Sequence, residues 1–66
     1  MIGDRIKELR ESAGLSSLVL AEKAGLSPSY LREVESGRRD PDLKVLARIA
    51  AALGVTPAAL LKPPGL

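Results

Sequence analysis

The sequence predicts an all-α fold, a compact five-helix domain that takes in residues 1–66 as a single unit. At three places a capping residue stands between the two apolar residues of a hydrophobic staple, and glycines follow the predicted helix ends. Apolar residues recur at three- and four-residue spacings, and no segment alternates as a strand would. We expect helices at about 3–13, 17–24, 28–36, 43–53 and 57–61, with a loose tail at 62–66.

The first predicted helix carries one apolar stripe. Its members are Ile2, Ile6, Leu9 and Ala13. They are spaced four, three and four residues apart, so they share one face of a helix. Gly14 is expected to end this helix.

Residues 15–37 are predicted to form two short helices joined by a tight turn. Ser16 can cap the first helix, and Gly25 supplies the positive φ that the turn requires. Ser27 can cap the second helix, with Pro28 at its first position, where the missing N–H is harmless. This is the arrangement of a helix-turn-helix, in which the second helix reads DNA.

The second helix of this pair is predicted to have one apolar and one polar face. Leu31 and Val34, three residues apart, place one side on the core, and the small Ala21 lets the preceding helix cross closely. The polar side consists of Pro28, Ser29, Arg32, Glu33 and Ser36. In a major groove, Arg32 can donate to guanine, Glu33 can accept from cytosine, and Ser29 can do either. Composition alone favours the simpler interpretation, a solvated helix face.

The remaining helices follow the same capping pattern. Asp42 is the expected cap of the helix at 43–53, whose buried stripe is Val45, Leu46, Ile49, Ala50 and Leu53. Thr56 followed by Pro57 opens the short helix at 57–61.

Composition excludes several function classes. Cysteine and histidine are absent, which excludes disulfides and the usual zinc sites and fits a reducing cytoplasm. No apolar run approaches the length of a membrane span, and we expect no membrane association. No glycine-rich phosphate loop or catalytic constellation stands out, so we expect neither an enzyme nor a cofactor. The net charge of +2 permits a nucleic-acid partner without arguing for one.

Two motifs, LAEKAGLSPSYLREVESGRR and P-x-L-x-x-L-x-x-IA-x-ALGV, resemble the phage repressor and Cro (Xre-type) family of helix-turn-helix DNA-binding domains. The resemblance covers roughly residues 2–61. It implies a repressor-like fold with the helix-turn-helix at the second and third helices, and a sequence-specific transcriptional regulator of double-stranded DNA. Base contacts would then come from Pro28, Ser29, Arg32 and Glu33.

Phosphate contacts are expected from helix N-termini, where N–H groups attract anions, and from basic residues near the second helix of the motif. The expected residues are Ser17, Ser27, Tyr30, Ser36, Arg38, Arg39, Lys44 and Arg10. Ser17 stands where the family often has glutamine, a longer side chain that braces the recognition helix. The resemblance also implies a partly buried salt bridge between Arg10 and Glu35.

Two apolar surfaces suggest partners. The resemblance implies a homodimer on a palindromic operator, with Val55, Ala58, Ala59 and Leu61 as the dimer surface. Leu18 and Val19 point away from the core, where the family usually has polar or acidic residues. They are either isolated exposed residues or a contact for a protein partner. The alternative function is therefore a protein-interaction module, or an antitoxin, on the same fold.

Overall fold

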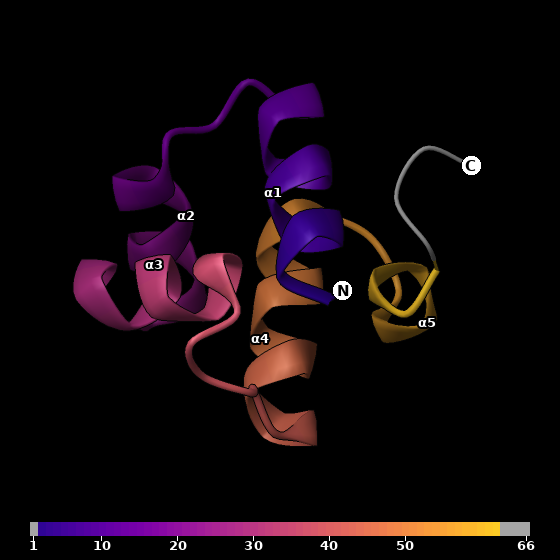
Figure 1. Ribbon diagram of the computed structural model, residues 1–66. Helices are drawn as coiled ribbons and strands as arrows, with labels where there is room; N and C mark the ends of the chain where they lie inside the picture. The colour runs from indigo at the N-terminus through magenta and orange to yellow at the C-terminus, as the bar shows by residue number, and fades with distance from the viewer. Residues whose placement is uncertain (1, 63–66) are drawn as a thin grey trace.

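The computed structural model describes residues 2–62, which form five helices and no strand. They are α1 (Ile2–Ser12), α2 (Ser17–Ala24), α3 (Pro28–Ser36), α4 (Leu43–Leu53) and α5 (Pro57–Leu60) (Figure 1). α1 and α4 occupy the middle of the molecule, α2 and α3 lie to one side, and α5 lies to the other (Figure 1). α2 packs on both α4 and α3, and α1 packs on α3. The predicted all-α class is confirmed. Of the tail predicted at 62–66, residues 63–66 lie outside the described range.

Three of the predicted caps are hydrogen-bonded as expected. The pairs are Ser16 Oγ with the Val19 N–H (3.1 Å), Ser27 Oγ with the Tyr30 N–H (3.1 Å) and Asp42 Oδ1 with the Val45 N–H (2.9 Å). In each pair the side chain accepts from an N–H that has no partner within its helix. Thr56 holds the corresponding position before α5, but its side chain makes no capping bond, so that part of the prediction is wrong.

The turn between α2 and α3 has the predicted left-handed glycine. Gly25 has a φ of 71°, and the Leu26 N–H reaches back 2.9 Å to the carbonyl oxygen of Ala21. This bond satisfies a carbonyl at the end of α2 and reverses the chain within a few residues. Ala21 is fully buried, as its predicted position at a close helix crossing requires.

Two predicted helix ends are displaced by about one residue. α1 ends at Ser12, and Ala13 is an exposed turn residue rather than part of the apolar stripe, because the chain already turns at Ala13 and Gly14. α5 ends at Leu60, which is buried, while Leu61 is its exposed C-cap.

The core is wholly aliphatic. Its buried members are Ile6, Leu20, Ala21, Ala24, Leu31, Val34, Leu46, Ile49, Ala50 and Leu60. In the stripe predicted for α4, Val45 and Leu53 are only partly buried and pack at the edge of this cluster.

One core contact, the crossing of α1 over α3, was not predicted. A Cβ at Gly3 would collide with the carbonyl oxygen of Val34 and lie 2.6 Å from that of Glu35. Only glycine allows this approach of helix to backbone.

Candidate nucleic-acid interface

α3 is divided into a buried side and an open polar side. Leu31 and Val34 are fully buried, while Ser29 and Arg32 are exposed. An open depression on this side is lined by Ser29, Arg32, Glu33, Ser36 and Arg38. The structure thus brings together three of the predicted base-contact residues and two of the predicted phosphate-contact residues. Pro28, the fourth base-contact candidate, is half-buried at the first position of the helix.

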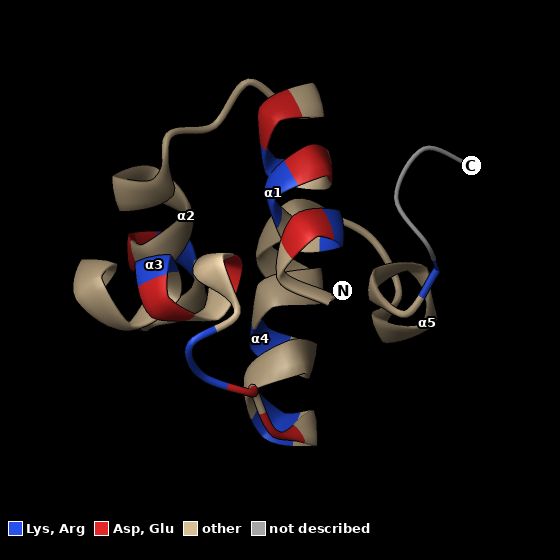
Figure 2. Ribbon diagram, viewed as in Figure 1, with Lys and Arg blue, Asp and Glu red and all other residues tan. Residues whose placement is uncertain are grey.

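Charge of both signs surrounds this depression. Figure 2 shows basic and acidic residues side by side on α3, with the basic loop that leads toward α4 directly after it. Arg38 and Arg39 are exposed in this loop, and Lys44 is exposed in the first turn of α4. Side chains of the polar face can therefore donate and accept, while cations stand beside it where a phosphate backbone would pass.

The serines at the helix N-termini are not equivalent. Ser16, not Ser17, caps α2, and Ser17 is half-buried in its first turn. The Ser27 oxygen accepts from the Tyr30 N–H, so its hydroxyl proton can donate to a phosphate. The Ser36 hydroxyl donates 3.0 Å to the carbonyl oxygen of Glu33 and is already used within α3.

Arg10 and Glu35 form the predicted ion pair between α1 and α3. Arg10 Nε lies 2.8 Å from Glu35 Oε2, and Nη2 lies 3.2 Å from Oε1, which makes the pair bidentate. Arg10 Nη1 also donates 2.9 Å to the carbonyl oxygen of Leu15, which ties down the start of the next loop. The side chains are 12% and 9% exposed. All three nitrogens of the Arg10 guanidinium are hydrogen-bonded within the protein, so Arg10 holds α1, α3 and the loop after α1 together. This geometry does not support the expected phosphate contact.

A second ion pair lies on the open side of α3, and sequence reasoning missed it. Arg39 Nε is 3.3 Å from Glu33 Oε1, and the Arg39 guanidinium carbon lies 5.5 Å from the centre of the Tyr30 ring. The side chains of Arg39 and Glu33 are 54% and 43% exposed. Glu33 and Arg39 are six residues apart across the end of a helix, so no helical spacing pointed to the contact.

The apolar residues predicted to form partner surfaces differ in exposure. Leu18 and Val19 are 54% and 39% exposed on α2, and Leu61 is 66% exposed at the end of α5. Ala58 is also exposed, while Val55 and Ala59 are half-buried. Leu43, the first residue of α4, is a further exposed apolar residue that the helix pattern did not single out.

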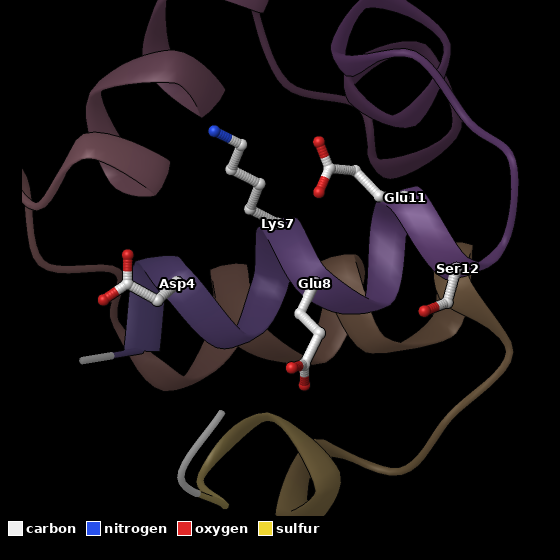
Figure 3. A pocket seen from close by; sticks show the side chains of 5 residues that line it. All are labelled: Asp4, Lys7, Glu8, Glu11 and Ser12. Carbon is white, nitrogen blue, oxygen red and sulfur yellow. The ribbon is translucent and has the colours of Figure 1, made fainter. Parts of the chain in front are cut away.

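A second depression runs along the outer side of α1, lined by Asp4, Lys7, Glu8, Glu11 and Ser12. Figure 3 shows these side chains spread along the helix, with Glu8 on the opposite side from Lys7 and Glu11. They do not converge on a common point, as groups that act on one substrate would. Among residues 2–62, no group of three acidic, histidine or cysteine side chains is placed to hold a metal ion. Within the same range, no helix has the length and apolar character needed to cross a membrane.

Comparison with known proteins gives a consistent result. A helix-turn-helix family model matches residues 6–60. The immunity repressor of Bacillus phage phi105 is 43% identical over 60 residues, which are 91% of this chain and 42% of the repressor. The chain therefore spans less than half the length of that relative.

Solved structures agree in fold. The restriction-modification controller protein C.AhdI from Aeromonas hydrophila is 41% identical with a TM-score of 0.88, and 89% of each chain is covered. SinR, the master regulator for biofilm formation, solved in complex with DNA, is 41% identical with a TM-score of 0.89. That match covers 94% of this chain and all of the SinR chain. The chain belongs to the Xre-type helix-turn-helix family of phage repressor and Cro-like domains.

Proposed function

We propose that this chain is the DNA-reading part of a sequence-specific transcriptional regulator, a repressor that inserts α3 into the major groove of double-stranded DNA. One observation carries the proposal. α3 is anchored by the fully buried Leu31 and Val34, and its other side presents donors and acceptors around an open depression. The structure of the related SinR chain in complex with DNA supports it. This function places the protein in the cytoplasm.

Base readout is assigned to the exposed side of α3. Arg32 would donate to the O6 and N7 of guanine, and Glu33 would accept from the amino group of cytosine. Ser29 would donate or accept one turn earlier on the same side, and Pro28 offers only apolar contact, as with a thymine methyl group.

Phosphate contacts are assigned to residues around this face. They are Ser17, Ser27, Tyr30, Arg38 and Lys44. The Ser36 hydroxyl would join them only by leaving the carbonyl oxygen of Glu33, to which it donates. Each would fix the position of the domain on the duplex without contributing directly to sequence preference. Arg39 differs from this group because its guanidinium already contacts Glu33 and Tyr30.

The test of base readout is selection of duplex DNA from a random pool at near-physiological salt. We expect an enriched motif with two-fold symmetry. Arg32→Met should then relax the base preference at one position in each half-site. Arg38→Met should instead weaken binding to every sequence alike, and it should lower the slope of log affinity against log salt concentration by about one. Binding that enriches no motif and weakens as the salt concentration rises would contradict the proposal, because it would come from phosphate contacts alone.

We also propose that the regulator acts as a homodimer with half-sites about 34 Å apart, one turn of the duplex. The proposed surface contains Val55, Ala58, Ala59 and Leu61, and the large exposed fraction of Leu61 supports it. Sedimentation at micromolar concentration should show a dimer with operator present, and Leu61→Ser should shift it toward monomer. A monomer with and without operator would contradict this part of the proposal.

Leu18 and Val19 favour a second candidate, a protein-interaction module or an antitoxin on the same fold. Both are exposed on α2, one helix away from the reading face of α3. The double substitution Leu18→Ser and Val19→Ser should leave the enriched DNA motif unchanged if the chain acts through DNA alone. The second candidate would be favoured if the unaltered chain bound DNA weakly and unselectively but bound a protein partner tightly, and if the double variant lost that partner.

A further inference from the structure

Arg39 contacts two side chains of α3, those of Glu33 and Tyr30. Its Nε lies 3.3 Å from Glu33 Oε1, and its guanidinium lies over the Tyr30 ring, 5.5 Å from the ring centre. Tyr30 and Glu33 are three residues apart, so they are neighbours on one side of the helix. The guanidinium therefore contacts a carboxylate through Nε while its carbon lies over an aromatic ring, two contacts for which a guanidinium is better suited than the ammonium group of lysine.

The backbone holds Arg39 in reach of this pair. The carbonyl oxygen of Glu33 accepts from the Arg38 N–H at 2.9 Å, the Arg39 N–H at 3.3 Å and the Ser36 hydroxyl at 3.0 Å. The Gly37 N–H also points back to the end of α3. The loop that carries Arg39 is thus bonded to the same residue whose side chain Arg39 contacts, which limits how far the guanidinium can move away.

We propose that Arg39 is a positioning residue for base readout by Glu33, and not simply another phosphate contact; this inference rests on the proposed DNA-reading function. A carboxylate in the groove approaches two rows of phosphates, and a nearby cation offsets the repulsion. Because Arg39 engages Oε1, Oε2 is left to accept from an amino group on a base edge. Arg39 would therefore sharpen which base is accepted opposite Glu33.

The expected effect is modest because both side chains are about half exposed, at 54% and 43%. Exposed ion pairs typically change an equilibrium by a factor of about 1.5 to 5. We expect removal of Arg39 to reduce the preference for the favoured base opposite Glu33 by about 2- to 5-fold. A pure phosphate contact would leave that ratio unchanged while lowering the affinity for every sequence.

The test repeats the selection from a random duplex pool with four variants beside the unaltered chain. Glu33→Gln identifies the base position that Glu33 reads. Arg39→Met is compared with Arg38→Met, a matched control that removes one positive charge from the adjacent exposed position of the loop. The double variant Glu33→Gln with Arg39→Met tests whether the effect of Arg39 passes through Glu33.

We expect Arg39→Met to lower base preference at the Glu33 position, and Arg38→Met to leave it unchanged. In the Glu33→Gln background, Arg39→Met should have no further effect on that preference. If Arg39→Met behaves like Arg38→Met at every position, the inference is wrong while the proposed function stands. If a motif is enriched but Glu33→Gln changes no position in it, this inference and the assignment of base readout to Glu33 are both wrong, while sequence-specific DNA binding stands. A pool with no enriched motif would overturn the proposed function and this inference with it.

Discussion

The ion pair between Arg10 and Glu35 leads to a sharp prediction about stability. Replacing Glu35 by glutamine removes the negative charge but keeps one acceptor oxygen, so one of the two bonds from Arg10 is lost. Hydrogen bonds to charged groups contribute about 1.5–3 kcal/mol, and loss of a whole partner from a buried pair costs about 3–5 kcal/mol. We expect Glu35→Gln to lower the free energy of unfolding by about 2 kcal/mol, because the Arg10 charge stays buried. A domain of this size has only about 3–5 kcal/mol in total.

The assay is thermal and urea unfolding followed by circular dichroism. A loss of about 2 kcal/mol corresponds to a fall in Tm of roughly 8–16 °C for a domain this small. The matched control is Glu33→Gln, the same chemical change two residues earlier on α3. There the ion pair is exposed, so we expect a loss below about 1 kcal/mol.

A double substitution separates the pair from its surroundings. Arg10→Met with Glu35→Leu removes both charges, and it should destabilise by less than the sum of the two single changes because neither charge is left alone. If Glu35→Gln lowers Tm no more than Glu33→Gln does, the buried pair does not stabilise the α1–α3 contact and the reasoning is wrong.

Three further predictions concern the scaffold, each measured by Tm against the unaltered chain. A change from glycine to alanine normally stabilises a helix, but in Gly3→Ala the new Cβ collides with the backbone of α3 at Val34. We therefore expect the free energy of unfolding to fall by about 1–3 kcal/mol, and a rise in Tm would contradict the close crossing. Ser27→Ala should lower the free energy of unfolding by about 1 kcal/mol because it removes the capping bond to the Tyr30 N–H. Thr56→Ala should change it little because the Thr56 side chain makes no capping bond, and equal losses in the two variants would contradict this distinction. Arg5→Met removes the 2.9 Å bond from Nε to the carbonyl oxygen of Ala59, which joins α1 to α5, and the ion pair with Glu8. It should lower Tm, and sedimentation should show less dimer; an unchanged Tm would contradict a stabilising role for the bond between α1 and α5.

The helices and their faces follow from patterns within short stretches of the chain. Ser16, Ser27 and Asp42 cap the helices that they were predicted to cap, because a capping bond joins residues only three apart. Leu31 and Val34 are buried because helical period alone places them on one side. The polar side of α3 follows from the same period, so the candidate reading face was predictable before any tertiary contact was known.

The Arg10–Glu35 pair came from a different source. Twenty-five positions separate the two residues, and no periodic rule joins them. Resemblance to the repressor family implied the contact, and the tertiary structure supplied its bidentate geometry and burial.

How the helices meet and which surface charges pair depends on the packing of the whole chain. Gly3 looked like an ordinary helix start until α3 was placed against it, since a close approach depends on two elements that the sequence does not orient. Arg39 was predicted to contact phosphate, and its contacts with Glu33 and Tyr30 became apparent only from the way the chain leaves the end of α3. Local bonds are encoded by neighbours in the chain, whereas contacts across loops depend on the relative placement of whole helices, which packing of the aliphatic core determines.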